Sequence, residues 1–211
     1  MTDRPVRSAG RVRPRSVLIL TTLSFIALTA FVIVAGASAA DVAVRTAVLS
    51  LSSPPVIAIM KIINAGGDWR VLFPGTVALF LVFERARPRW WVWAALMIVA
   101  PLSEQAMKHL VGRPRPEAES FGFPSGHTTA AAAFFGALIY LAGSLPGAAC
   151  RIVRVLAVLA IVGVGCARIM LRAHWPSDVL GGAALGLALA SLATMIATVP
   201  TVSAGGSAAP S

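Results

Sequence analysis

The chain has 211 residues, of which 57% are hydrophobic and only 12% are charged, and its mean hydropathy is +0.82. So little polar sequence cannot cover a water-soluble core, which places the chain in a membrane. The formal net charge of +10 would suggest a nucleic-acid partner for a soluble protein, but here the basic residues lie between apolar runs and are typical of topology signals, so we expect no nucleic-acid binding.

The N-terminal region combines a basic segment with an apolar one. Residues 1–16 contain five arginines and are expected to form a basic cytoplasmic tail. The apolar run Val17–Ala40 that follows is long enough to cross a bilayer. Although Ala37-Ser38-Ala39 looks like a cleavage site, the length of the run favours an uncleaved anchor over a signal peptide.

Five more apolar runs follow in chain order: Val71–Phe83, Trp90–Met107, Thr128–Ala142, Ile152–Met170 and Val179–Val199. With the first run they predict an all-α, polytopic membrane protein with six transmembrane helices in one bundle, over residues 17–199. The second run is short for crossing hydrocarbon, so its helix is expected to begin nearer Gly66 or to tilt.

Two segments fall outside these predicted spans. Residues 41–69 hold Pro54-Pro55 and Gly66-Gly67 around an apolar piece with Lys61, which favours a helix lying on the membrane surface. Residues 200–211 are rich in Ser, Gly, Ala and Pro and are predicted to be disordered.

The distribution of Lys and Arg orients the predicted bundle. A cytoplasmic N-terminus puts ten basic residues inside: the five of the tail, Arg85, Arg87, Arg89, Arg151 and Arg154. Eight lie on the other side: Arg45, Lys61, Arg70, Lys108, Arg113, Arg115, Arg168 and Arg172. The positive-inside rule therefore favours a multi-pass plasma-membrane protein with a cytoplasmic N-terminus, and the eight outside charges need another explanation.

Three polar stretches meet at the non-cytoplasmic face in this topology. The first, Lys108–Pro116, follows the third predicted span, the second, Phe123–His127, opens the fourth, and the third, Ala167–Asp178, joins the fifth to the sixth. Lys, Arg, Ser, His and Asp residues at one end of a bundle are typical of a site that handles an anionic group in a partly dry environment.

In the second stretch, Pro124-Ser125-Gly126 precedes an Ala-rich run and predicts a helix start with Ser125 as N-cap. Small residues there let a phosphate oxygen approach the backbone amides at the positive end of the helix dipole. Ordinary capping is the alternative, but capping does not require an imidazole at His127.

In the third stretch, His174 and Asp178 are four residues apart, and Pro176 suits the first position of the last helix. Asp178 could then accept a hydrogen bond from His174, fix its tautomer and leave its other nitrogen free to attack. The alternatives are that Asp178 only complements the helix dipole, that His174 is an interfacial polar residue, and that Arg168 snorkels to the membrane surface.

In the first stretch, Lys108 and Arg115 would supply fixed positive charge to a phosphoryl group. An interfacial basic loop is one alternative. An intrahelical ion pair between Glu104 and Lys108, which are four residues apart, is another.

Together the three stretches resemble the signature of the type 2 phosphatidic acid phosphatase superfamily, which includes vanadium haloperoxidases. That signature is Lys-x6-Arg-Pro, then Pro-Ser-Gly-His, then Ser-Arg-x5-His-x3-Asp. Its spacing selects Lys108 with Arg115-Pro116, the second element matches fully, and the third matches at Arg168, His174 and Asp178. Ala167 stands where the family usually has Ser, so the contact of that hydroxyl is absent or is supplied elsewhere.

The resemblance implies an integral membrane phosphatase that needs no metal or other cofactor and acts on a lipid phosphate or an isoprenoid diphosphate. The motifs recognise the phosphate alone, so undecaprenyl diphosphate, phosphatidylglycerophosphate and phosphatidic acid are all open as substrates. It implies that His174 attacks phosphorus to form a phosphohistidine, that Asp178 orients it, and that His127 protonates the leaving oxygen and then activates water. It also implies a set of groups that hold the phosphate oxygens: Lys108, Arg115, Ser125, Gly126 and Arg168. Arg113, Arg172 and His109 are optional in this scheme, and His109 is not expected to be catalytic because the spacing gives it no partner.

Three other functions fit parts of the sequence. A non-catalytic protein that binds or transports lipid phosphates would have the same fold, but it would not need a nucleophile, an orienting acid and a second histidine together. A metallohydrolase would need compact ligand spacing, which His109, His127, His174 and Asp178 do not provide. A haloperoxidase would share the vanadate-binding residues, although the six predicted spans favour a lipid substrate.

Overall fold

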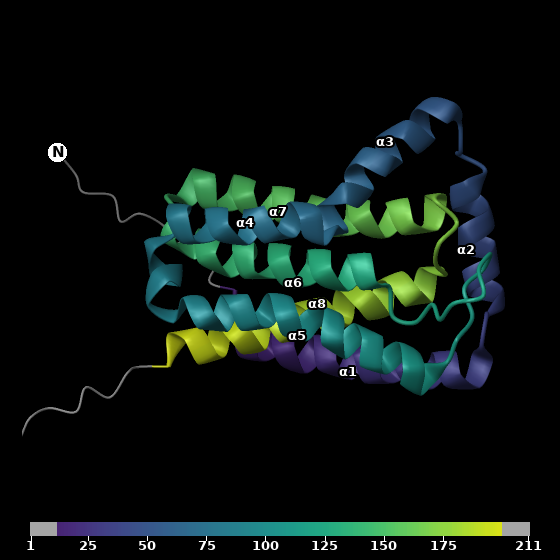
Figure 1. Cartoon of the computed structure of the whole chain (residues 1–211), viewed down its shortest axis with the longest axis horizontal. Helices are drawn as coiled ribbons and strands as arrows, with labels where there is room; N and C mark the ends of the chain where they lie inside the picture. Colours follow the sequence, from purple (N-terminus) through teal and green to yellow (C-terminus); the bar gives the residue numbers. More distant parts are fainter. Residues whose placement is uncertain (1–11, 200–211) are drawn as a thin grey trace, which may run out of the picture.

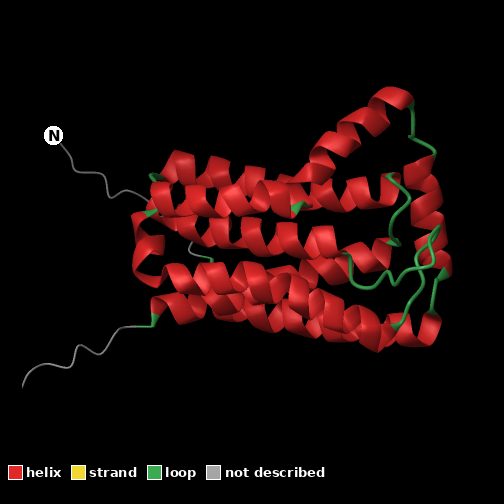
Figure 2. Cartoon of the chain, in the orientation of Figure 1, coloured by secondary structure: helices red, strands yellow, loops and turns green. Residues whose placement is uncertain are grey.

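The structure is a computed structural model that describes residues 12–199, and the regular structure within this range is helical throughout (Figure 2). The prediction of an all-α fold is therefore confirmed. Arg4, Arg7 and Arg11 of the predicted basic tail lie outside the described residues, as does the predicted disordered tail at 200–211.

Six helices lie side by side in a bundle and alternate in direction (Figure 1). They are α1 (Pro14–Ala35), α4 (Trp69–Val82), α5 (Trp90–Val111), α6 (Gly126–Leu141), α7 (Gly147–Met170) and α8 (Pro176–Thr198). Each predicted apolar run falls on one of them, although the first, Val17–Ala40, continues past the end of α1 into the start of the next helix at Ala39. Helix α4 begins nearer Gly66 than its apolar run does, as expected. The short helices η2 (Glu84–Arg89) and η3 (Ala142–Ser144) close the far end, where both ends of the described chain lie.

The opposite end, called here the site end, carries the segment that precedes α4. Helix α2 (Ala39–Leu49) runs across this end, and α3 (Pro54–Asn64) slants back along α7 to the turn η1 (Ala65–Gly67) and the start of α4 (Figure 1). The chain bends by 116° between α2 and α3. The sequence predicts one surface helix here, whereas the structure has two, and Lys61 lies on the helix that packs against α7.

Three of the described helices are long and apolar enough to cross a membrane, namely α1, α7 and α8, and the bent pair α2–α3 would make a fourth. Helices α4 and α6 have only 14 and 16 residues, and α5 includes polar and charged residues in its second half. Helix length and composition alone therefore support three to four crossings, and they do not confirm the six that the sequence predicts. Large apolar side chains such as Leu23, Phe73 and Leu159 face outward along the bundle, which is typical of a surface in contact with lipid.

A seam of small residues joins α6 to α8. A Cβ atom on Gly186 would lie 2.4 Å from the carbonyl oxygen of Thr129, and one on Gly182 would lie 2.6 Å from that of Ser125. Small residues let helix backbones approach closely in membranes. At the site end this approach continues into a hydrogen bond of 2.9 Å from the amide of Ser125 to the carbonyl oxygen of Asp178. The seam thus sets the second polar stretch beside the third.

Candidate active site

Helix α5 delivers the first polar stretch to the site end. It ends at Val111 and is followed by Gly112, whose φ of +63° is the left-handed conformation common at helix C-termini. The chain then folds back on itself, because Gly122 donates to the carbonyl of Arg113 (2.7 Å) and Arg115 donates to that of Ser120 (3.1 Å). This loop holds two arginines of the Arg-Pro-Arg-Pro segment over the ends of α6 and α8.

Lys108 lies in the last turn of α5 and forms an ion pair with Glu104. The intrahelical pair considered as an alternative is therefore present. The Glu104 carboxylate is buried and lies against Gly126, because a Cβ atom there would be 2.8 Å from Glu104 Oε1. The pair thus places Lys108 near the start of α6, so the structural and the phosphate-binding interpretations of this lysine are compatible.

The start of α6 is open to an anion. Ser125 occupies the predicted N-cap position, but its hydroxyl contacts the Thr128 hydroxyl (2.9 Å) and no side chain caps the first amides. Gly126 and His127 both line a cavity at this point. Uncapped amides at a helix N-terminus attract negative charge, so this terminus is suited to bind phosphate oxygens. Ser125 itself is fully buried behind them.

His174 and Asp178 form the pair that their spacing predicts. Helix α8 begins at Pro176, Asp178 lies in its first turn, and Nδ1 of His174 is 3.4 Å from Oδ2 of Asp178. Burial lowers the pKa of His174 below its ordinary value; Asp178 opposes this shift, and the charges of Arg168 and Arg115 add to it. The imidazole is therefore neutral at pH 7, with Nδ1 toward the carboxylate and Nε2 available to a substrate.

Arg168 lies near the end of α7 and points into the site rather than snorkelling outward. Its Nη1 donates to Asn64 Oδ1 (3.0 Å) at the end of α3, and its side chain lines the same cavity as His174. The preceding Ala167 is fully buried in the bundle.

One cavity of about 680 Å³ connects these groups to the flank of the bundle. Its polar end is lined by five basic or imidazole residues and two acidic ones, namely Lys108, Arg115, His127, Arg168 and His174 with Asp68 and Glu104. From there an apolar arm runs along α4 and α5, lined among others by Leu72, Phe73, Phe80, Trp90, Met97 and Ile98. Phe73, Trp90 and Ile98 are also exposed on the outside of the bundle. The cavity therefore joins a cationic pocket to the lipid-facing surface.

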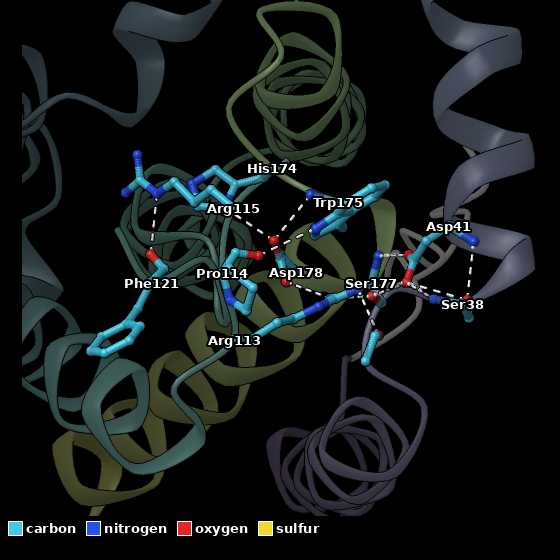
Figure 3. Close-up of polar contacts among 11 residues, drawn as sticks. Ser38, Asp41, Arg113, Pro114, Arg115, Phe121, His174, Trp175, Ser177 and Asp178 are labelled. Atoms are coloured by element: carbon cyan, nitrogen blue, oxygen red, sulfur yellow. Dashed lines mark hydrogen bonds and ion pairs between the residues drawn. The ribbon is translucent and has the colours of Figure 1, made fainter. Parts of the chain in front are cut away.

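The sequence assigned no role to three basic residues, and the structure separates them. Arg113 is only 4% exposed and binds Asp178, together with Asp41 of α2 (Figure 3). Arg172 is exposed and pairs with Glu117, and His109 contacts Gln105 outside the cavity. Asp41 was the sequence feature that could have indicated a role for Arg113, because an acidic residue at the end of an apolar run needs a buried basic partner.

Within residues 12–199, no three His, Cys, Asp or Glu side chains are grouped so that they could hold a metal ion.

Comparisons with known proteins agree with this geometry. Residues 75–199 match the family model of the PAP2 superfamily. Phosphatidylglycerophosphatase B of Bacillus subtilis (strain 168) is 30% identical over 178 residues, which are 79% of this chain and 88% of that protein. The lipid A 1-phosphatase of Rhizobium etli is 30% identical over 115 residues, 46% of either chain. The crystal structure of a transmembrane PAP2 type phosphatidylglycerolphosphate phosphatase from Bacillus subtilis superposes with a TM-score of 0.74 at 28% identity, covering 87% of this chain and 95% of that one.

Proposed function

This chain belongs to the PAP2 superfamily, and from that premise we propose that it is an integral membrane phosphatase that removes phosphate from a lipid. The three polar stretches resemble the signature of this same superfamily, so the sequence prediction of the family is confirmed. Phosphatidylglycerophosphatase B and lipid A 1-phosphatase are both named as phosphatases of lipids. This similarity supports a phosphatase over a non-catalytic binding protein.

The cavity is the observation that carries the proposal. A lipid phosphate has an anionic head and a long apolar tail, and the cavity offers a cationic end and an apolar arm in one continuous space. The phosphate would lie between Lys108, Arg115, Arg168 and the first amides of α6, which supply the positive charge that a metal ion supplies in other phosphatases. The tail would leave the bundle between α4 and α5, into lipid.

The proposed reaction has two displacements at phosphorus. In the first, Nε2 of His174 forms a bond to phosphorus while the bond from phosphorus to the leaving oxygen breaks, and that oxygen takes a proton from His127. In the second, His127 takes a proton from water, the water oxygen bonds to phosphorus, and the bond to Nε2 breaks to release phosphate. Asp178 accepts a hydrogen bond from the Nδ1–H group of His174 in both steps, and its negative charge stabilises the positive charge that forms on the ring.

We further propose that the natural substrate is a lipid monophosphate of the phosphatidylglycerophosphate class, with phosphatidic acid and undecaprenyl diphosphate as the rival substrates. The relative that matches most of this chain supports that choice by its name. The polar end of the cavity contacts only the phosphate in this scheme, so the choice among these lipids rests on the similarity.

All six bundle helices are proposed to cross the plasma membrane, with the site end outside the cytoplasm. The alternating helix directions put the N-terminus of α1 at the end opposite His174 (Figure 1). Arg85, Arg151 and Arg154 lie at that same end as the N-terminus, which supports a cytoplasmic location for it.

The test is phosphate release by the purified protein in detergent micelles that contain each of the three lipids, with His174→Ala as the matched inactive variant. We expect release from at least one lipid, greatest from phosphatidylglycerophosphate, resistant to a metal chelator and absent in His174→Ala. Equal release by the wild type and His174→Ala would refute the proposed nucleophile. No release from any of the three lipids would refute the phosphatase.

A further inference from the structure

Arg113 is a buried guanidinium that the proposed phosphate pocket does not use. Its Nη1 donates to Oδ1 of Asp178 and to the hydroxyl of Ser177, both at 2.6 Å. Its Nη2 donates to Oδ2 of Asp41 (2.7 Å) and to the carbonyl of Gly36 (3.0 Å). The side chains of Arg113 and Asp41 are each 3% exposed and that of Asp178 is 0% exposed. Figure 3 shows the guanidinium lying between the two carboxylates.

These bonds fix the plane of the Asp178 carboxylate. Oδ1 accepts from Arg113, while Oδ2 accepts from the backbone amide of Trp175 (3.0 Å) and faces Nδ1 of His174. With a donor on each oxygen the carboxylate cannot turn about its own axis, so Oδ2 stays opposite the imidazole. Short hydrogen bonds between charged groups are stronger than neutral ones, and the bond from Arg113 to Asp178 is also shielded from water.

The other side of Arg113 is held by the junction between α1 and α2. Asp41 accepts from the Ser177 amide and the Ser177 hydroxyl, both at 2.9 Å, as well as from Arg113. The Ser177 contacts tie Asp41 to the first turn of α8, next to Asp178. The guanidinium also lies 5.7 Å from the ring centroid of Trp175. Arg113 is thus held through both of its terminal nitrogens by groups outside the cavity, whereas its buried Nε has no hydrogen-bond partner among the residues that the structure describes.

The charges of this cluster complement the proposed chemistry. Two carboxylates share one guanidinium, which leaves one net negative charge buried beside His174. His174 gains a positive charge when Nε2 bonds to phosphorus. A fixed, buried negative charge aimed at that ring stabilises the intermediate more than the resting enzyme, which is the condition for a faster reaction.

We propose that Arg113 is a positioning residue for this reaction, acting through Asp178, and that the α1–α2 junction holds it there through Asp41. This inference rests on the proposed function, because it assigns Arg113 an effect on the His174 nucleophile. It predicts that Arg113 changes turnover rather than substrate binding, and that it has no effect of its own once Asp178 is neutral.

A double-mutant cycle tests the inference. Arg113→Gln should lower kcat on the order of 10- to 100-fold, with KM changed by less than about threefold. In the Asp178→Asn background the same change should cost less than about threefold, because residues that act through one another are not additive. Arg113→Lys, which keeps a single charge, should recover part of the loss. Arg172→Gln is the matched control, since its guanidinium pairs with exposed Glu117, and it should keep wild-type kcat.

Removing Arg113 alone leaves two unpaired buried carboxylates, which can prevent folding. The double variant Arg113→Gln/Asp41→Asn keeps the net charge of the cluster and leaves only one unpaired carboxylate, that of Asp178. It should show the same loss in kcat. A readout independent of activity is the ¹⁵N spectrum of the three histidines, with His174 assigned from His174→Ala. Wild type should show His174 protonated on Nδ1 alone, and the double variant should show both tautomers.

The outcomes separate the two proposals. An equal loss from Arg113→Gln in both Asp178 backgrounds, a rise in KM at unchanged kcat, or an unchanged His174 tautomer would overturn the role of Arg113 while leaving the phosphatase intact. Absence of phosphatase activity in the wild type together with the expected tautomer change would refute the proposed function and leave the positioning of His174 standing.

Discussion

Adding a single methyl group at Gly182 should damage both the stability and the activity of the protein. A Cβ atom there would lie 2.6 Å from the Ser125 carbonyl oxygen, roughly 0.8 Å short of ordinary contact. That oxygen already accepts hydrogen bonds from the amide and the hydroxyl of Thr129, each 2.9 Å long. It cannot yield alone, so in Gly182→Ala the starts of α6 and α8 must part.

Overpacking of this kind costs about 1–3 kcal/mol of unfolding free energy. The same movement separates the amides of α6 from the His174–Asp178 pair, and a displacement near 1 Å lowers catalytic efficiency on the order of 100-fold. The measurements are thermal unfolding in detergent and kcat/KM for lipid phosphate release. The matched control is Gly147→Ala, where the added methyl meets no atom within 4 Å and should leave both quantities unchanged. A Gly182→Ala variant with wild-type kcat/KM would show that the seam does not position the site, even if the unfolding temperature fell.

Four further outcomes are expected. His174→Ala should abolish turnover with the fold intact. Asp178→Asn should keep some activity, lower than that of the wild type by about 10²- to 10⁴-fold, because it loses only the group that orients the nucleophile. Equal rates for the two variants in single-turnover assays would contradict these roles. Vanadate should inhibit competitively, since it adopts the geometry of the transition state, and no inhibition at a large excess over substrate would argue against the phosphate pocket. The acid limb of kcat/KM against pH should lie below about 6.5, because burial lowers the pKa of His174 and the neutral nucleophile is lost only as pH falls through that value; a limb above 6.5 would contradict the burial argument. In intact cells of a variant without native cysteines, a membrane-impermeant thiol reagent should label Ala118→Cys at the site end and not Ala148→Cys at the far end, and the reverse pattern would overturn the proposed orientation.

Local sequence signals predicted most of the helices. The apolar runs located all six bundle helices because a run of that length has few ways to bury its backbone polar groups except as a helix. The segment between α1 and α4 was harder, since its two helices are short and apolar. Its start signal was nevertheless readable, because Ser38 and Asp41 form a capping box at the start of α2. The break between α2 and α3 also has a local signal, because Pro54 begins α3, but that signal does not predict the 116° bend between the two helices.

The predicted site residues were found by their spacing, and Arg113 was missed for the same reason. The signature selects Arg115, so the neighbouring Arg-Pro pair was left without a role. The partner that reveals Arg113 is Asp41, 72 residues earlier in the chain, and a contact of that range is set by the fold. Similar pairs account for two of the eight basic residues that are predicted to lie outside, because Arg45 and Arg172 both bind Glu117.

Two of the basic residues at the far end also have local partners. Arg87 donates to the carbonyls of Phe80 and Leu81 at the end of α4, and Arg89 donates to that of Val199 after α8. Cations at a helix C-terminus bind carbonyl groups that have no partner in the helix, and they interact favourably with the negative end of the helix dipole. The same charges therefore serve helix termination as well as the topology that the sequence indicated.

The apolar arm between α4 and α5 determines how the protein would meet its substrate. A site that opens sideways samples molecules diffusing in the plane of the bilayer and does not require them to pass through water. The rate would then follow the mole fraction of substrate within the lipid or detergent phase, so that adding inert detergent at constant total substrate slows the reaction. Competition would likewise come from neighbouring lipids, each of which occupies the same lateral opening for part of the time.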